Sequence, residues 1–334
     1  MSEPLVSVVI PTHNRREKLK YLIKSILESD YRKDKLEIIV VDDASSDGTR
    51  EYVKKLFPQI KVVRNETERL LAASRNIGVR VSKGKYIFIV DDDNVVDRNT
   101  IKELVEFMEQ HPEVGVVGPI MYFFRDPKRI WCAGVRRNYW TTITKFIYFN
   151  TVDDGSLREP YESEDFPNAF IVRRKVIEKV GVFNSKLFPI HYDEADFCQR
   201  VRRAGYKIMV VPTAKVWHDI SLPEQSRASL LHLKNPLRAY YTVRNRILYH
   251  FLWSKNVLQR FVAVLASLAI TAYYVIVVLM SAPDYRCVVL RAMIKGVIDS
   301  FRLMKEALKY HRFILCSNNG GITVNNIKTL NTNI

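Results

Sequence analysis

The chain has 334 residues, of which 47% are hydrophobic and 26% charged; this composition excludes a wholly disordered protein and is enough for one large folded domain with an appendage. Its four cysteines are scattered without a CxxC pair, which excludes a disulfide scaffold and favours a reducing compartment. The formal net charge is +16, and residues 227–312 alone hold 14 Lys and Arg against three acids; without a base-reading basic helix or an aromatic RNA-binding signature, this excess favours an anionic membrane surface over nucleic acid.

Short apolar runs alternate with amphipathic runs through the first part of the chain. Five apolar runs have the length and β-branched content of buried strands: 6–10, 36–41, 60–63, 86–90 and 114–117. Four stretches between them have the spacing of helices with one apolar face: 17–29, 49–57, 72–81 and 100–109. Such alternation predicts an α/β, Rossmann-like fold whose mostly parallel sheet is covered by helices on both faces.

The second part of the chain is less regular. Residues 121–164 are rich in aromatic side chains and give no clear element. The elements expected beyond them are a strand and a helix within 170–180, a helix at 193–205, short strands at 208–211 and 214–217, and a basic aromatic helical region after Asn235.

Polar segments follow three of the predicted strands at the point where each strand ends. They are Thr12–Asn14, Asp42–Thr49 and Asp91–Asn94. In open α/β sheets, ligands bind outside the carboxyl ends of the strands. The three segments therefore predict a binding site on one rim of the sheet.

Asp91 and Asp93 stand two residues apart at the end of a strand. Their carboxylates can face the same side, and Mg²⁺ or Mn²⁺ prefers such hard oxygen ligands. A solvated or helix-capping cluster is the alternative interpretation. The earlier acidic strand end at Asp42-Asp43 favours the metal site.

Asp42-Asp43 closes the second strand, and an acid at this place can accept a hydrogen bond from the ring N–H of a pyrimidine base. The alternative is a helix cap shared with Asp47 and Thr49. Both interpretations can hold, with the turn at Asp47-Gly48-Thr49 and the upstream pair facing the cleft.

Asp193-Glu194 opens the helix at 193–205, where a carboxylate can take the proton of an attacking hydroxyl group. The alternative is an acidic helix start that suits the helix dipole. His218 follows a short strand and is a candidate third metal ligand. Trp217 is a packing residue or a platform for a sugar ring.

Five motifs, in order and spacing, resemble the family 2 glycosyltransferases, which have the GT-A fold. They are VSVVIPTHNR at 6–15, VDDASSDGT at 41–49, AASRNIGVRVSKGKYIFIVDDD at 72–93, DEADFCQRVRRAGY at 193–206 and VWH at 216–218. The segment AYYTVRNRILYHF at 239–251 is similar to the segment after the catalytic domain in rhamnosyltransferase-like and related cell-surface branches.

The resemblance implies a metal-dependent enzyme that transfers one sugar, with inversion, from a nucleotide-diphosphate-sugar to a glycan or lipid-linked acceptor. The donor nucleotide would contact Pro11, Thr12, Asn14, Asp42, Asp43, Arg75, Asp91 and Asp92. The metal, Mn²⁺ or Mg²⁺, would be held by Asp91, Asp93 and His218. Glu194 matches the proposed base, with Asp193 as the alternative because the family's acid pair is reversed here; Trp217 and Asp196 are candidates for the acceptor or the sugar.

Two other classes stay open on the sequence alone. A sugar-nucleotide nucleotidyltransferase shares a related sheet, but its glycine-rich phosphate loop is replaced here by PTHNRRE. A non-catalytic nucleotide-sugar-binding scaffold would keep Asp43 and Asp93 and need no base. A processive synthase is disfavoured because CQRVRRAGY stands where a QxxRW motif would be expected.

Residues 261–280 carry no charge, and a run of ~20 apolar residues can span a bilayer. Three arrangements fit it: one span, an interfacial or re-entrant helix pair, or a buried helix in a homo-oligomer. The basic amphipathic pattern at 288–308 favours a helix on the membrane surface. Since the N-terminus is unlike a signal peptide, we expect the cytoplasmic face of the cell membrane.

The sequence thus predicts a GT-A catalytic domain at 1–232, a membrane-associated helical region at 233–312 and a polar tail at 313–334.

Overall fold

The computed structural model describes residues 3–222, 231, 233–281 and 286–317, and the chain divides into two compact units. Unit 1 consists of Met1–Arg136, Phe146–Ser185 and Asp193–Ile220. Unit 2 consists of Arg137–Lys145, Lys186–Tyr192 and Ser221–Ile334. Residues 318–334 of the predicted polar tail lie outside the described residues.

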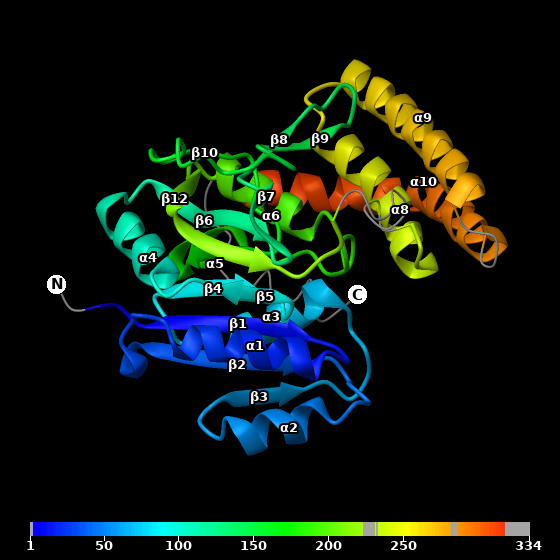
Figure 1. The fold of residues 1–334 in the computed structure, drawn as a ribbon. Coiled ribbons are helices and arrows are strands. Elements are labelled where there is room, and N and C mark those ends of the chain that lie inside the picture. Colours follow the sequence, from blue (N-terminus) through cyan, green and yellow to red (C-terminus); the bar gives the residue numbers. More distant parts are fainter. Residues whose placement is uncertain (1–2, 223–230, 232, 282–285, 318–334) are drawn as a thin grey trace. The chain divides into compact units, whose positions relative to one another are not determined.

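A ten-stranded sheet forms the centre of unit 1 (Figure 1). Its strands are Val6–Thr12 (β1), Leu36–Asp42 (β2), Lys61–Arg64 (β3), Tyr86–Val90 (β4), Asn94–Val96 (β5), Val114–Phe123 (β6), Asp126–Cys132 (β7), Tyr161–Glu162 (β10), Ala169–Arg173 (β11) and Lys207–His218 (β12). They lie in the order β10-β12-β6-β11-β4-β1-β2-β3, while β5 pairs with β12 and β7 with β6.

Parallel pairing dominates among the strands β1 to β4, whose apolar runs are clearest in the sequence. β1 pairs parallel with β2 and β4, β2 with β3, and β12 with β6. β11 lies antiparallel between β4 and β6. All residues of β1 and β4 are buried, as expected for strands covered on both faces. The prediction of an α/β, GT-A-like sheet is confirmed.

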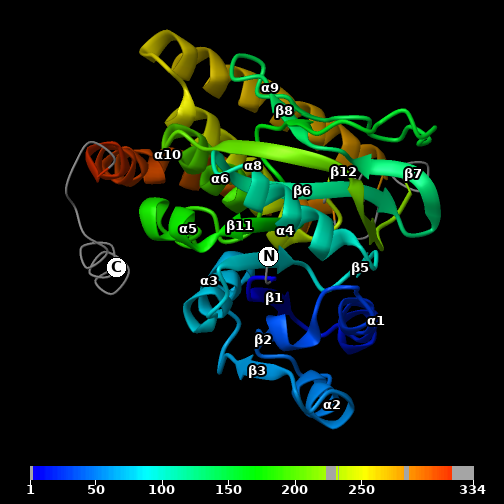
Figure 2. The same cartoon turned by 90° about the vertical axis from the view of Figure 1, so that its left-hand side faces the viewer.

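Helices cover both faces of this sheet. They are Arg16–Leu27 (α1), Thr49–Leu56 (α2), Leu71–Val81 (α3), Thr100–Gln110 (α4), Arg174–Val180 (α5) and Asp193–Arg203 (α6), with a 3₁₀ turn (η1) at Lys33–Lys35. Figure 2 shows α3 on the opposite side of β1, β2 and β3 from α1 and α2. Gly78 lets α3 approach β1 closely, since a Cβ atom there would lie 2.3 Å from Val9 Cγ1.

Two details of the strands differ from the sequence prediction. The short strands expected at 208–211 and 214–217 are one strand, β12, whose register against β6 shifts between Val211 and Lys215. Pro212 has no N–H to donate, which suits an irregularity that leaves the strand continuous. The region 121–164 is also more regular than expected, because β6 continues to Phe123 and β7 and β10 follow it.

Unit 2 is built around three helices, Pro236–Trp253 (α8), Val257–Ser281 (α9) and Arg286–Ser317 (α10). The Asn235 side chain caps α8 by accepting a 3.1 Å hydrogen bond from the Arg238 N–H. The core between the helices is apolar: Leu233, Ala239, Val243, Ile247, Tyr274, Val277, Val278, Val289 and Met293. A two-stranded hairpin, Val135–Arg137 (β8) and Thr144–Phe146 (β9), stands outside the large sheet.

Candidate active site

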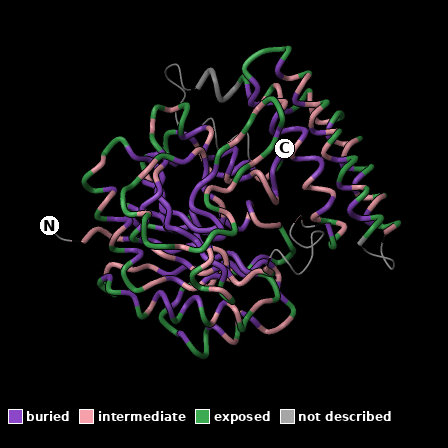
Figure 3. Tube along the Cα trace, turned by 45° about the horizontal axis from the view of Figure 1, so that its top comes forward, coloured by how far each residue is buried: buried purple, intermediate pink, exposed green. Residues whose placement is uncertain are grey.

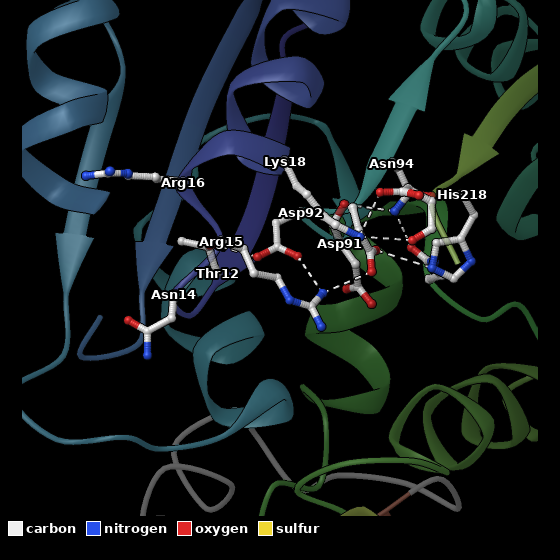
Figure 4. A network of polar contacts seen from close by, with 12 residues as sticks. Thr12, Asn14, Arg15, Arg16, Lys18, Asp91, Asp92, Asn94 and His218 are labelled. Carbon is white, nitrogen blue, oxygen red and sulfur yellow. Dashed lines mark hydrogen bonds and ion pairs between the residues drawn. The ribbon is translucent and has the colours of Figure 1, made fainter. Parts of the chain in front are cut away.

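The acidic triplet follows β4 directly and faces the end of β1. Thr12 Oγ1 donates a 2.7 Å hydrogen bond to Asp92 Oδ2. Arg15 Nη1 lies 3.1 Å from Asp92 Oδ1 and 2.9 Å from Asp93 Oδ2. Figure 4 shows Arg15 directed toward the acids, whereas Asn14 points elsewhere. The two strand ends are therefore joined by a guanidinium group between carboxylates.

Asp93 also meets His218, the last residue of β12. The antiparallel pairing of β12 with β5 sets His218 opposite Asn94. His218 Nε2 then lies 3.3 Å from Asp93 Oδ1, and the Asp219 N–H donates to the Asp93 carbonyl at 2.8 Å. Although burial opposes ionisation of Asp93, His218 and Arg15 hold its pKa below the usual range.

This pair fits part of a divalent-metal site. The Asp93 carboxylate and the His218 imidazole are groups that bind Mn²⁺, and His218 Nδ1 is buried without a hydrogen-bond partner among the described residues. Asp91 lies apart, because its carboxylate is paired with Arg75. No set of three His, Cys, Asp or Glu side chains within the described residues is arranged to hold a metal. A cation bound here would need further oxygen ligands from elsewhere.

Arg75, on α3, joins three carboxylates that are far apart in sequence. Its Nη2 lies 2.7 Å from Asp91 Oδ1, and its Nη1 lies 2.6 Å from Asp193 Oδ2 and 2.7 Å from Glu194 Oε1. The Arg75 side chain is fully buried. Burial opposes its charge, but Asp91, Glu194 and Asp193 together raise the pKa of Arg75 well above its usual value.

The two candidate bases at the start of α6 have different surroundings. The Asp193 side chain is fully buried, whereas 14% of the Glu194 side chain is exposed. Burial and the neighbouring Glu194 raise the pKa of Asp193 well above its usual range. For Glu194, burial is outweighed by Arg75 and by a hydrogen bond from Asp193, which lower its pKa to about 2. The two opposite shifts make Glu194 the more acidic member of the pair, while Asp193 holds a proton more tightly.

Asp92 also has a shifted pKa. Burial, only partly offset by Arg15 and increased by Asp93, raises the pKa of Asp92 to about 7. Since Asp92 accepts from Thr12 and Arg15 at once, it serves to tie the ends of β1 and β4 together.

Asp42 and Asp43 lie in a second network at the end of β2. Asp42 Oδ2 lies 2.8 Å from Arg64 Nη1, and Asp42 Oδ1 accepts from the Ser45 N–H. The Asp43 carboxylate accepts from the backbone N–H groups of Arg69 and Leu70, each at 2.9 Å. Both carboxylates therefore shape the loops after β2 and β3, and their contact with a base stays a prediction.

The other predicted site residues occupy varied places. Pro11 is buried in β1, and Asn14 Oδ1 accepts from the Ser46 N–H at 2.7 Å. Trp217 Nε1 donates to the Pro127 carbonyl at 3.2 Å. Asp196 is buried and paired with Arg200 at 3.1 Å, so its direct environment is protein rather than a free surface.

Two residues of the site were not singled out from the sequence, although Arg15 ends the motif VSVVIPTHNR and Asn94 ends the predicted polar segment Asp91–Asn94. One is Arg15, for which the available signal was a basic residue directly after the polar end of the first strand. The other is Asn94, which donates to the Asp91 carbonyl and to Asn168 Oδ1. The second contact depends on a residue 74 positions away and has no local signal.

Comparison with known proteins shows which family has sequences of this kind. The model of the family described as glycosyl transferase family 2 matches residues 7–181, just over half of the chain. The chain belongs to glycosyl transferase family 2. The probable glycosyltransferase YdaM of Bacillus subtilis is 28% identical over 228 residues, covering 65% of this chain and 51% of YdaM. The chain spans about half or less of the first curated relatives that it matches.

Solved structures agree on the fold of this family 2 protein. GalNAc-T7 with UDP, GalNAc and Mn²⁺ is 19% identical, with a TM-score of 0.59 over 92% of this chain and 57% of that one. The mannosyltransferase PcManGT from Pyrobaculum calidifontis, in complex with GDP-Man and Mn²⁺, is 17% identical, with a TM-score of 0.53 over 95% of this chain and 86% of that one. The predicted GT-A fold and the predicted family are both confirmed.

Proposed function

We propose that this family 2 protein transfers one sugar from a nucleotide-diphosphate-sugar to a hydroxyl group of an acceptor, with inversion at the anomeric carbon. The observation that carries the proposal is the convergence on Arg75 of Asp91, from the end of β4, with Asp193 and Glu194, from the start of α6. Acids separated by about a hundred residues thus share one cation, next to the Asp92–Asp93 cluster.

Glu194 is the proposed base. It is the more exposed member of the acid pair, and it is already ionised, so it can accept a proton from the acceptor hydroxyl. Arg75 fixes the direction of its carboxylate but also weakens its basicity. Proton transfer therefore requires that the Arg75–Glu194 contact lengthens as the acceptor oxygen approaches the sugar.

Asp93 and His218 are the proposed metal ligands, with the donor diphosphate providing further oxygens. A bound Mn²⁺ or Mg²⁺ would supply charge stabilisation to the departing diphosphate. Arg15 is paired with Asp92 and Asp93, and its guanidinium group could bind the donor diphosphate in place of these carboxylates. Both neighbouring structures named above contain a nucleotide and Mn²⁺, which supports a donor and cation of this class.

A lipid-linked or glycan acceptor at the cytoplasmic face of the membrane is the proposed second substrate. The support is the apolar helix α9, which is long and apolar enough to cross a membrane by length and composition, and the excess of basic residues around it.

Transfer and donor hydrolysis can be followed by chromatography of released nucleoside diphosphate, using the full chain with Mn²⁺. Glu194→Gln should lower kcat by ~10²–10⁴-fold while leaving nucleotide affinity near that of the wild type, because only proton acceptance is lost. Asp193→Asn should have a smaller effect on kcat. Glu51→Gln, at an exposed acid on α2, is the matched control.

Three outcomes would count against this assignment. Equal kcat for Glu194→Gln and wild type would remove Glu194 as the base. Retention of nucleotide-sugar binding with no turnover by the wild type on any hydroxyl acceptor would favour a binding scaffold. A product with the donor's anomeric configuration, read by NMR, would contradict inversion.

A further inference from the structure

Helix α9 has one face packed within unit 2 and one face that unit 2 leaves exposed. Ala263, Ser267, Thr271, Tyr274 and Val278 are buried and recur every three or four residues along the helix. The opposite positions are apolar and between 42% and 80% exposed: Leu258, Phe261, Leu265, Tyr273, Ile276 and Met280. Figure 3 shows buried and exposed stretches alternating along the C-terminal helices. The exposed stripe runs the length of the helix.

Such a stripe is unfavourable in water, since the free energy of a protein rises with the apolar area that it leaves exposed. It also lacks the charged residues that normally face solvent: residues 261–280 contain none. A surface of this kind marks a contact with a membrane or with another apolar surface.

The buried face of α9 argues against a simple membrane crossing. It packs on α8, whose Arg246 donates a 2.9 Å hydrogen bond from Nη2 to the Tyr274 hydroxyl. Only a third of the apolar window of α9 is buried in this way, so the helix is neither enclosed in a core nor free on all sides. A crossing would carry the arginines of α8 toward the hydrocarbon, where a charged side chain is strongly unfavourable.

Basic residues stand at both ends of the stripe. Lys255 is exposed just before α9, and Arg291 and Lys295 are exposed in the first turns of α10. Between residues 255 and 295 the sequence holds five Lys and Arg and a single acid, Asp284. Anionic lipid headgroups complement this pattern, because they attract basic residues near the membrane surface.

We propose that α9 lies in the plane of an anionic lipid bilayer, with its exposed stripe in the boundary between headgroups and acyl chains, and does not cross the membrane. A helix in this position buries its apolar face by about 5–10 Å and keeps its polar neighbours in water. The proposal concerns unit 2 and a lipid surface, so it can fail or hold independently of the sugar-transfer site.

The first test is flotation of the full chain with phosphatidylcholine vesicles, with or without phosphatidylglycerol. We expect the protein to float with the anionic vesicles and at least tenfold less with the neutral ones. The double variant Phe261→Glu/Ile276→Glu places charge in the stripe and should lower the vesicle-bound fraction at least tenfold. Leu56→Glu, at a leucine 44% exposed on α2, is the matched control and should bind like the wild type.

Circular dichroism should show equal helix content for all three proteins, because each substituted side chain lies on the exposed face of its helix. Binding that the double variant retains in full, or equal binding to neutral and anionic vesicles, would overturn the proposal. The proposal would also be overturned if the wild type is a dimer in light scattering and does not bind vesicles, whereas the double variant is a monomer. A second copy of the chain would then cover the stripe.

The second test separates the interfacial helix from a span. In a Cys287→Ser/Cys316→Ser background, Lys54→Cys reports on unit 1 and Lys309→Cys on α10, and both lysines are exposed. Sealed membrane vesicles from expressing cells are treated with a membrane-impermeant maleimide. The two remaining native cysteines of the described residues are buried, so they should not react with the maleimide. If α9 lies in the membrane plane, both introduced cysteines should be labelled from the same side. Labelling from opposite sides would show that α9 crosses the bilayer.

Discussion

Arg75 combines full burial with three acidic partners, which makes it the residue whose replacement should be most informative. A guanidinium group holds carboxylates in a fixed planar geometry that an ammonium group cannot reproduce. Arg75→Lys should therefore lower kcat more than it weakens donor binding. Removing one partner of a buried charged cluster typically costs about 3–5 kcal/mol, so Arg75→Gln should also lower the free energy of unfolding by roughly that amount.

Steady-state kinetics and nucleotide titration of Arg75→Lys distinguish two roles for this arginine. A loss in kcat at unchanged donor affinity supports positioning of the carboxylates. Weaker donor binding at unchanged kcat would instead support the nucleotide contact that the sequence resemblance implies. Arg80→Lys, at an exposed arginine of the same helix, is the control.

His250, in α8, carries a second prediction because it is buried and neither ring nitrogen has a hydrogen-bond partner among the described residues. Burial first, and then Arg137 and Arg246, lower its pKa well below the usual value. Above pH 6.5 the folded and unfolded states are both neutral at this residue. As the pH falls below about 6.5, the unfolded state gains a proton that the folded state excludes, and stability is lost by up to about 1.4 kcal/mol per pH unit.

His250→Phe should remove this dependence. Urea denaturation at pH 7 and pH 5 should show that the variant loses less stability than the wild type on acidification, by up to about 2 kcal/mol. His111→Phe, at a histidine whose side chain is 41% exposed, is the control for replacing an imidazole by a phenyl ring. Parallel pH profiles for wild type and His250→Phe would mean that His250 takes up a proton in the folded protein.

Sequence reasoning reached the residues of the site more readily than their partners. Asp91, Asp93, Asp193 and Glu194 follow strand ends or open a helix, and such positions are visible in a local pattern. The partner that Asp91, Asp193 and Glu194 share is not, because Arg75 reaches Asp193 across 118 positions. A buried ion pair is fixed by tertiary packing, and nothing in the residues around Arg75 encodes it.

Strands, too, were predictable only where a local sequence pattern marks them. β1, β2 and β4 were predictable since parallel strands buried on both faces read as continuous apolar runs. The strands β7 and β10 were not, because they lie near the sheet's margin and contain polar, exposed residues. The join of two expected strands into β12 was missed because Pro212 normally signals a strand end.

Helix α3 carries Arg75 and depends on a glycine for its place on the sheet. A Cβ atom at Gly78 would lie 2.3 Å from Val9 Cγ1 and 3.2 Å from Val41 Cγ2. Gly78→Ala should therefore destabilise the protein by ~1–3 kcal/mol through overpacking, despite the better helix propensity of alanine. The measurement is the urea midpoint of unfolding.

The double variant Gly78→Ala/Val9→Ala tests the cause. Removing the valine methyl groups should make the two substitutions less costly together than the sum of the single effects. Strict additivity would place the strain elsewhere, and a stabilised Gly78→Ala variant would show that α3 shifts without cost.

The two compact units of the chain have separate proposed roles, sugar transfer for unit 1 and lipid binding for unit 2. Unit 1 holds the acids, Arg15, Arg75 and His218, whereas unit 2 holds the apolar stripe of α9. Unit 2 includes Arg137–Lys145 and Lys186–Tyr192 as well as the C-terminal helices, so removing the chain after residue 220 would leave these two segments without their partners. Substitutions are therefore better probes of each unit than truncations.

A ligand that binds only the folded chain raises its free energy of unfolding, by about 2.7 kcal/mol when present at a hundred times its Kd. We expect the thermal midpoint to rise more with one nucleoside diphosphate (UDP, GDP or dTDP) and Mn²⁺ together than with the sum of each alone, because Asp93, His218 and the diphosphate would share the ion. Asp93→Asn should abolish that synergy and sugar transfer while keeping the shift due to the nucleotide alone. Lys54→Ala, at an exposed lysine on α2, should retain both. Full synergy in Asp93→Asn, or wild-type transfer in excess EDTA, would remove the metal from the proposed reaction.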